Sequence, residues 1–216
     1  MARPIAADAE ATRRRILAAA LALFSEHGLD RTTMRQIAAA ARVTMATVHH
    51  YYGGKHDLYR ACIEAMYEEL AELRADLESL FLSSRANDPS MAQFVDAAVR
   101  KSYAFARAHR PIVQLMMRTI LDTGELEADK RERYLLPFLA EGARVLAPVL
   151  GQPPLRVRLA LLSLNHLIVR FALSAPRELA LVIDRPDASA EESTRAVEDY
   201  LVAQARDQLS LAGGSQ

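Results

Sequence analysis

The sequence has little of several residue types that define particular protein classes. It contains one cysteine, Cys62, no tryptophan, and only 6% aromatic residues among its 216 positions. A single cysteine excludes an internal disulfide framework and a thiolate cage for zinc or iron–sulfur, so a reducing setting is expected. The formal net charge is zero, because 27 basic residues balance 27 acidic residues. Taken alone, this balance argues against a nucleic-acid partner, because phosphates bind basic surfaces.

The sequence also lacks a long uninterrupted apolar run. The most apolar segment, residues 155–175, contains Arg156, Arg158 and Arg170, and such charges are costly inside a bilayer. Near the start, three arginines precede the apolar residues 16–24, but residues 25–28 do not resemble a signal-peptide cleavage site. The sequence therefore predicts a cytoplasmic protein without a membrane partner.

Motifs of the common enzyme classes are missing. The sequence has no glycine-rich phosphate loop, no HExxH, no nucleophile elbow and no cysteine–histidine pair at a useful spacing. His49, His50 and His56 are close in sequence, but adjacent histidines on a helix point in different directions and no carboxylate pattern accompanies them. We therefore predict a protein that is not an enzyme and has no metal site or other cofactor.

Apolar residues recur every three to four positions, and no stretch shows the alternation of a strand. This periodicity predicts an all-α protein of about nine helices. The first helix is expected to end at Gly28, the second to begin with a capping box of Thr33 and Gln36, and the third to have Thr44 as its N-cap. The later helices are predicted at residues 55–83, 91–108, 111–122, 126–150, 155–175 and 190–211, with residues 176–188 joining the last two.

The zero net charge hides two halves of opposite sign. Residues 1–60 contain nine Lys and Arg against five Asp and Glu, whereas residues 61–216 contain 18 against 22. Four of the six histidines also lie in the first segment. This asymmetry indicates a basic module on an acidic body. We predict two domains, at residues 1–54 and at residues 55–216.

Residues 33–52 have the organisation of a helix-turn-helix, in which the second helix enters the major groove of DNA. The small residues 38–41 allow the two helices to pack closely. The helix N-termini at Thr33 and Thr44 present free N–H groups and a positive dipole end, which suit phosphates. The pattern favours a protein that binds double-stranded DNA.

At these residues the sequence resembles the TetR family of transcriptional regulators. The resemblance extends without a gap over about 50 residues, roughly a quarter of the chain. The matching residues are Phe24, Gly28, Thr32, Thr33, Ile37, Ala38, Ala41, Val43, Thr47, Tyr51, Tyr52, Lys55 and Leu58. The resemblance implies that residues 1–54 are a DNA-binding domain and residues 55–216 a helical regulatory domain. It also implies a homodimeric repressor that leaves a pseudo-palindromic operator when a small, largely hydrophobic effector binds. A helix-turn-helix activator or architectural protein without an effector is the alternative.

The resemblance also implies individual DNA contacts. Arg35 lies where the family often contacts a base, and arginine suits guanine O6 and N7. Phosphate contacts are implied for Thr33, Thr47, Tyr51 and Lys55. The remaining groove-facing residues are Thr44, Met45, Ala46, His49 and His50.

Two positions depart from the family pattern. Arg42 lies where the family prefers a turn glycine, and if the turn needs a positive φ the arginine costs about 1 kcal/mol. His49 replaces a frequent tyrosine, so a contact at this position would depend on pH.

The apolar residues of segment 155–175 lie on nearly all sides of the expected helix, which is typical of a helix buried on two sides. One side can pack on its own domain and the other on a second copy of the chain. We predict that Leu159, Leu162, Val169 and Leu173 contribute to this dimer contact. The resemblance implies the same arrangement, a bundle formed by the last two helices of each subunit, which sets the spacing of the two recognition helices.

Within this segment Ser163, His166 and Arg170 form a polar stripe, and buried polar groups need partners. One interpretation is that His166 and Arg170 hold the polar end of an effector. The other interpretation is a hydrogen bond in the dimer interface or a salt bridge to an acidic residue. For the effector pocket, the remaining lining residues would be Tyr67, Tyr103, Met116 and Met117. The resemblance implies that the effector favours a state in which helix 55–83 is displaced.

Overall fold

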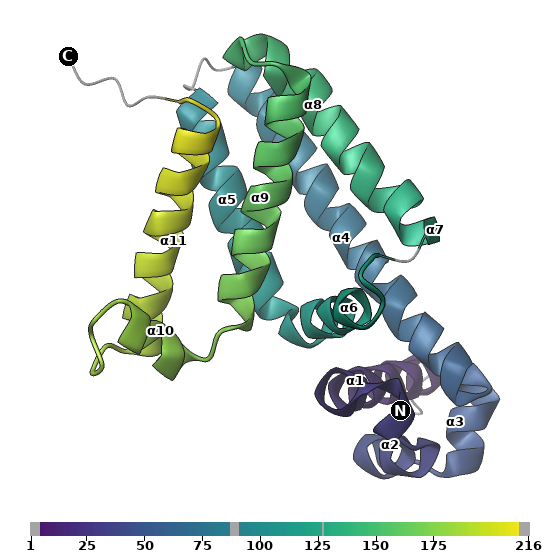
Figure 1. Ribbon diagram of the computed structural model, residues 1–216. Helices are drawn as coiled ribbons and strands as arrows, with labels where there is room; N and C mark the ends of the chain where they lie inside the picture. The colour runs from purple at the N-terminus through teal and green to yellow at the C-terminus, as the bar shows by residue number, and fades with distance from the viewer. Residues whose placement is uncertain (1–4, 87–90, 127, 212–216) are drawn as a thin grey trace. The chain divides into compact units, whose positions relative to one another are not determined.

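The computed structural model describes residues 5–86, 91–126 and 128–211. Every regular element within these ranges is a helix, which confirms the all-α prediction (Figure 1). The elements are α1 (Ile5–Arg31), α2 (Met34–Ala41), α3 (Met45–Tyr52), α4 (Lys55–Ala86), α5 (Met91–Ala108), α6 (Arg110–Thr123), α7 (Ala128–Lys130), the π-helical turn η1 (Arg131–Leu135), α8 (Leu136–Leu150), α9 (Pro154–Leu173), α10 (Pro176–Val182) and α11 (Ala190–Gln208).

Two regions differ from the sequence prediction. Residues 126–150, expected as one helix, contain α7, η1 and α8. The π-helical turn changes the hydrogen-bond spacing within a continuous helical path, and hydrophobic periodicity does not signal it. The expected connection at residues 176–188 contains α10, which buries Leu179 and Ala180. Pro176 at the first helical position is a sequence signal for this helix, because proline is pre-organised for that position.

The chain divides by its packing into two compact units. One consists of Met1–Glu72 with Pro111–Glu125, and the other of Leu73–Arg110 with Leu126–Gln216. The long helix α4 belongs to both units, because the division falls between residues 72 and 73. The DNA-binding and regulatory roles predicted for residues 1–54 and 55–216 are not defined by packing, so they stay a prediction.

In the first unit, α1, α2 and α3 lie together (Figure 1), and their buried residues form a small apolar core. Ile16 and Phe24 of α1, Ile37 of α2 and Val48 of α3 have no exposed surface. The Phe24 ring meets the ring of Tyr59 edge-on, with 5.3 Å between the centroids. Because these side chains fill the inner faces of α2 and α3, Arg35 and Gln36 of α2 and His49 and His50 of α3 remain on the outside.

Gly28 interrupts α1 near its end, as the sequence predicts. Its φ of 80° and ψ of 172° are not helical, and residues other than glycine rarely adopt this conformation. The Thr32 hydroxyl donates to the carbonyl oxygens of Gly28 and Leu23, at 2.8 and 3.2 Å. From α6, Arg118 donates to the carbonyl oxygen of Glu26 at 2.8 Å. Side chains outside α1 therefore donate to carbonyl groups near its end.

Cys62 is buried in α4, and we expect its thiol to be inert in the folded protein. Only 1% of the residue is exposed, and burial raises the pKa of the thiol to about 12. Because the thiolate is the reactive form, a disulfide reagent at pH 8 should label Cys62 only when this part of the chain opens. Labelling at the rate of a free thiol would contradict the burial.

The same shift gives a pH dependence of stability. The unfolded thiol loses its proton near its ordinary pKa of 9.0, whereas the folded thiol keeps its proton to about pH 12. The unfolded state therefore binds fewer protons between these values, and the free energy of unfolding falls as the pH rises through that window. Urea denaturation at pH 8 and pH 10.5 measures this fall. A Cys62→Ala variant, which lacks the titrating group, should lose less stability over the same range.

In the second unit, α5, α9 and α11 pack against one another. Arg100 of α5 pairs with Glu198 and Asp199 of α11, at 3.0 and 2.7 Å. Arg206 of α11 binds both carboxylate oxygens of Asp96. The order of these pairs along the two helices means that α5 and α11 are antiparallel. The buried apolar residues of these two helices include Val95, Val99, Tyr103, Val197, Leu201 and Val202.

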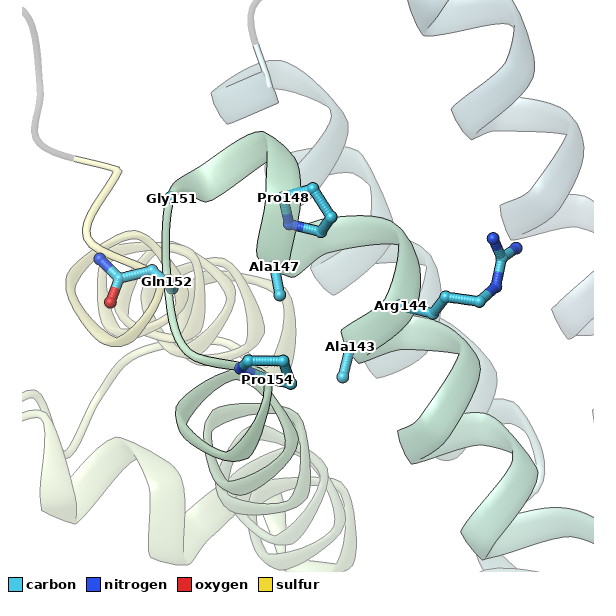
Figure 2. A pocket seen from close by; sticks show the side chains of 7 residues that line it. All are labelled: Ala143, Arg144, Ala147, Pro148, Gly151, Gln152 and Pro154. Carbon is cyan, nitrogen blue, oxygen red and sulfur yellow. The ribbon is translucent and has the colours of Figure 1, made fainter.

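A sharp corner joins α8 and α9. An open, mostly apolar hollow at this corner is lined by Ala143, Arg144, Ala147, Pro148, Gly151, Gln152 and Pro154 (Figure 2). The Arg144 side chain extends away from Pro154 and pairs with Glu141.

Among the described helices, none alone is long and apolar enough to span a membrane. The pair Ala128–Leu150 and Pro154–Leu173 meets the requirements of length and composition together, but it is bent by 118°.

Candidate nucleic-acid interface

Side-chain caps fix the first turns of both helices of the motif. The Thr33 hydroxyl accepts the Gln36 N–H at 3.3 Å, and the Gln36 side chain accepts the Thr33 N–H at 2.8 Å, which confirms the predicted capping box. The Thr44 hydroxyl accepts the Thr47 N–H at 3.1 Å, as predicted, and its oxygen lies 2.8 Å from the Thr47 hydroxyl. Each cap satisfies one N–H group of its first turn and leaves other N–H groups available to an anion.

The turn between α2 and α3 depends on Arg42, which has the left-handed conformation with φ 56° and ψ 47°. The Val43 N–H donates to the Ala38 carbonyl at 3.0 Å and so closes the end of α2. The turn therefore has a positive φ at Arg42, which is the condition under which a strain cost is predicted at this position. A side chain in this conformation costs about 1 kcal/mol relative to glycine.

We expect Arg42→Gly to raise the free energy of unfolding by about 0.5–1 kcal/mol. Glycine relieves the backbone strain of the folded state, but it also increases the conformational entropy of the unfolded chain, which offsets part of the gain. Arg42→Ala is the matched control, since it removes the charge and keeps a side chain in the left-handed conformation. Urea denaturation of the three proteins separates the two contributions. Equal gains in the glycine and alanine variants would assign the effect to charge instead of backbone strain.

The predicted contact residues of the motif are mostly exposed. Arg35 lies on the outside of α2, and Met45, Ala46, His49 and His50 are all exposed on α3. Thr33 and Thr44 are also exposed, and Thr47 is half-buried. In α3 the buried position is Val48. The structure thus brings the predicted groove-facing residues of α3 together on the side of the helix that does not pack on the core.

Tyr51 and Tyr52 have different surroundings. The Tyr52 hydroxyl donates to the Arg13 carbonyl at 3.0 Å, and the Arg13 guanidinium lies 5.6 Å from the ring centroid. Burial raises the pKa of Tyr52. Tyr51 is half-buried and meets the His50 ring edge-on at 5.3 Å. Tyr52 therefore packs α3 on α1, and Tyr51 is the residue of the pair placed beside the exposed histidine.

Lys55 has a partner that the sequence analysis missed. Its ammonium donates to the carbonyl oxygens of Leu29 and Asp30, at 2.9 and 3.4 Å. The signal for this contact is the end of α1, because the last carbonyl groups of a helix have no helical partner and often bind lysine or arginine. Lys55 thus fixes the start of α4 on the end of α1, and its predicted phosphate contact stays a prediction.

Asp57 forms a second cap that the sequence analysis missed. Its carboxylate accepts the Gly54 N–H at 3.0 Å and pairs with Arg60. The Gly54 N–H, followed by the Arg60 guanidinium, lowers the pKa of the Asp57 carboxyl. The sequence signal for this cap was an acidic residue three positions after Gly54, at the start of a long helix. Asp57 therefore fixes the turn through which α3 leads into α4.

The residues predicted to bind an effector lie in both units. Tyr67, Met116 and Met117 belong to the first unit, where Tyr67 is buried and the two methionines are half-buried. In the second unit Tyr103 is fully buried, and no described residue hydrogen-bonds its hydroxyl. His166 is exposed. The structure does not bring the buried Tyr103 and the exposed His166 into one enclosed cavity.

The polar stripe of α9 is exposed in the single chain. Arg170 donates to the Ser174 hydroxyl at 2.6 Å and pairs with Glu178 at 3.0 Å. This pairing lowers the pKa of Glu178. Ser163 and His166 are exposed on the same helix. Arg170 therefore forms a salt bridge to an acidic residue, as in the second interpretation of the polar stripe.

The residues predicted at a dimer contact differ in exposure. Leu159 is 57% exposed, Leu162 and Leu173 are half-buried, and Val169 is buried within its own chain. Leu155, which the prediction did not include, is 68% exposed one turn before Leu159. The exposed leucines of α9 therefore lie nearer its N-terminal end than the four residues predicted for the dimer contact.

The two short capped helices, the tight turn and the exposed face of the second helix define a helix-turn-helix. Residues 16–62 match the family model of "Bacterial regulatory proteins, tetR family". This match covers the helix-turn-helix and the start of α4, and over these residues it confirms the TetR-family resemblance predicted from the sequence.

The relatives and solved structures agree with this family. The HTH-type transcriptional dual regulator CecR of Shigella flexneri is 33% identical over 95 residues, or 42% of each chain. The regulatory protein RaaS of Mycobacterium tuberculosis is 32% identical over 130 residues, 56% of this chain and 54% of the relative. The chain thus spans about half the length, or less, of these relatives. Both are named as regulators, in agreement with the prediction of a protein that is not an enzyme.

The fold extends beyond the matched sequence. The crystal structure of a TetR-like transcriptional regulator from Rhodococcus sp. RHA1 has a TM-score of 0.57 at 19% identity and covers 99% of both chains. At this identity the similarity defines the fold alone. The helices after the helix-turn-helix therefore have the same fold as this TetR-like regulator, at low sequence identity.

Proposed function

We propose that this protein is a sequence-specific transcriptional repressor that acts as a homodimer and leaves its operator when a small, largely hydrophobic effector binds. The observation that carries the proposal is the exposed face of α3 in a TetR-family helix-turn-helix, with Met45, Ala46, His49 and His50 pointing away from the core. In this motif the second helix enters the major groove. The capped N-termini of α2 and α3 support phosphate contacts beside it.

DNA binding is tested with a duplex from the region upstream of the protein's own gene and a scrambled duplex of the same composition. Fluorescence anisotropy between 50 and 200 mM salt should give tighter binding to the upstream duplex. The logarithm of the binding constant should fall linearly with the logarithm of salt concentration, because phosphate contacts release counterions. Equal affinity for both duplexes would contradict sequence-specific recognition of this region.

The homodimer is supported by the exposed leucines of α9. Leu155 and Leu159 are 68% and 57% exposed and lie one turn apart, so they form one apolar surface. A second copy of the chain would bury this surface by a two-fold contact. Sedimentation at micromolar concentration should give a dimer, and Leu159→Arg should shift it toward monomer. A monomeric wild-type protein would count against the proposal.

The effector is supported by Tyr103 of α5. Its hydroxyl is buried without a hydrogen-bond partner among the described residues, and such a group costs about 1–3 kcal/mol. One polar atom on an otherwise apolar effector would satisfy this hydroxyl. A thermal-shift screen of small hydrophobic molecules should find compounds that stabilise the wild type more than Tyr103→Phe, because a ligand stabilises only the state it binds.

Each stabilising compound is then added to the protein–DNA complex. Release of DNA is the result expected for a repressor with an effector. If DNA binding persists with every compound, the alternative of an effector-independent regulator is favoured. For release, the effector must bind the two states of the protein with different affinity, a coupling of about 1–3 kcal/mol. The continuous helix α4, Lys55–Ala86, is the element that we propose to move.

A further inference from the structure

Met45 is an exposed apolar residue at the start of the recognition helix. It is the first residue of α3, and 51% of its surface is exposed. Between Asp8 and Gly54, no other large apolar side chain that the structure describes is exposed to this extent. The N-terminal residues of a recognition helix are those that contact base edges in the major groove. The exposed methionine thus occupies a position from which DNA sequence is recognised.

Neighbouring residues leave the Met45 side chain uncovered. The Thr44 and Thr47 hydroxyls lie 2.8 Å from one another, and the Thr44 hydroxyl also caps α3. Ala46 is too small to shield the thioether, and Val48 packs inward. One turn along α3, His49 is itself exposed. The apolar surface of Met45 can therefore be removed from water only by a partner outside the motif.

The chemistry of the major groove offers one apolar partner. Guanine and adenine present N7, guanine also presents O6, cytosine and adenine present amino groups, and thymine presents O4 together with its C5-methyl group. Of these groups only the methyl is apolar. Given the proposed function, on which this inference rests, we propose that Met45 contacts the C5-methyl group of a thymine in each operator half-site and selects that base.

The contact has a predictable size. Burying one methyl or methylene group contributes about 0.8 kcal/mol, and 1.4 kcal/mol corresponds to a factor of ten in affinity. Loss of the thymine methyl should therefore weaken binding about fourfold per half-site. Uracil in place of thymine removes only this methyl and keeps O4 and the Watson–Crick edge. The substitution thus isolates the proposed contact from all hydrogen bonding.

The experiment begins with selection of a binding site from random duplex DNA by the full-length protein. Each thymine of the selected site is then replaced singly by uracil, and affinities are measured for the wild type, Met45→Ala and Met45→Leu. The expected result is one thymine per half-site whose replacement weakens the wild type about fourfold. Met45→Ala should bind the two duplexes equally, whereas Met45→Leu, which keeps an apolar side chain, should retain the difference.

The outcomes distinguish this inference from the proposed function. If no sequence is enriched, sequence-specific DNA binding fails and the thymine contact fails with it. If a site is enriched but no uracil replacement weakens binding, the function stands and the Met45 contact is overturned. The contact is also overturned if Met45→Ala remains as sensitive to the same uracil as the wild type. Because each protein is compared with itself on two duplexes, a change in its stability does not affect the result.

Discussion

Phe24→Ala should lower the free energy of unfolding by about 3–5 kcal/mol, because the change leaves a cavity where a large buried ring was removed. Phe24 has no exposed surface, and its ring contacts Tyr59 edge-on across the first unit. The core formed by α1, α2 and α3 is small, so neighbouring side chains have little freedom to fill the space. The loss is a large fraction of the 5–15 kcal/mol that stabilises a typical domain.

Cys62 provides a local measurement of this loss, because its buried thiol lies in the same unit. The rate of thiol labelling at pH 8 should rise in Phe24→Ala in proportion to the open population of this unit. Phe24→Leu is the matched control and should cost less than about 1.5 kcal/mol, since it keeps most of the buried volume. Equal labelling rates in the wild type and Phe24→Ala would mean that Phe24 does not stabilise this unit.

Arg35→Ala should remove discrimination at one base position in each half-site, at a cost of about 1–3 kcal/mol per half-site. Arg35 is exposed on α2, where its guanidinium can form two parallel hydrogen bonds with guanine O6 and N7. Affinity for random DNA should change far less, because a base contact adds little to sequence-independent binding. The measurement is the affinity of both proteins for the selected site and for variants at each base pair.

Lys55→Ala is the matched contrast to Arg35→Ala. A phosphate contact from Lys55 should weaken binding to all sequences alike and flatten the salt dependence. Because Lys55 also binds the carbonyl groups of Leu29 and Asp30, Cys62 labelling of this variant is needed to show that the first unit stays folded. If Arg35→Ala weakens specific and random DNA equally, its assigned base contact is wrong.

Local features of the fold could be predicted from the sequence because their causes lie within a few residues. The Thr33 capping box spans three residues, and the Thr44 cap has the same spacing. Gly28 interrupts α1 at the predicted position with a positive φ, and Arg42 meets the condition stated for a strained turn. In each case one side chain or one backbone conformation determines the structure. The helix-turn-helix was therefore predictable residue by residue.

Contacts between distant segments could not be predicted in the same way. Lys55 is separated from Leu29 by 26 positions, and Arg118 from Glu26 by 92. Periodicity showed that the segment of α9 is apolar on most sides, but it could not tell which side the chain itself covers. Val169 is buried within its own chain while Leu155 is exposed. Such outcomes depend on which helices pack together, and a one-dimensional pattern does not contain that information.

The end of α1 has a consequence for how the sequence can vary. The groups that accept hydrogen bonds from Lys55 and Arg118 are main-chain carbonyls of Leu29, Asp30 and Glu26. Any residue at these three positions offers the same oxygen atom, so natural substitution there leaves the junction intact. The two cations have no such freedom, because each bond needs a long positively charged side chain. Selection on this junction should therefore fall on Lys55 of α4 and Arg118 of α6, while Glu26, Leu29 and Asp30 vary freely.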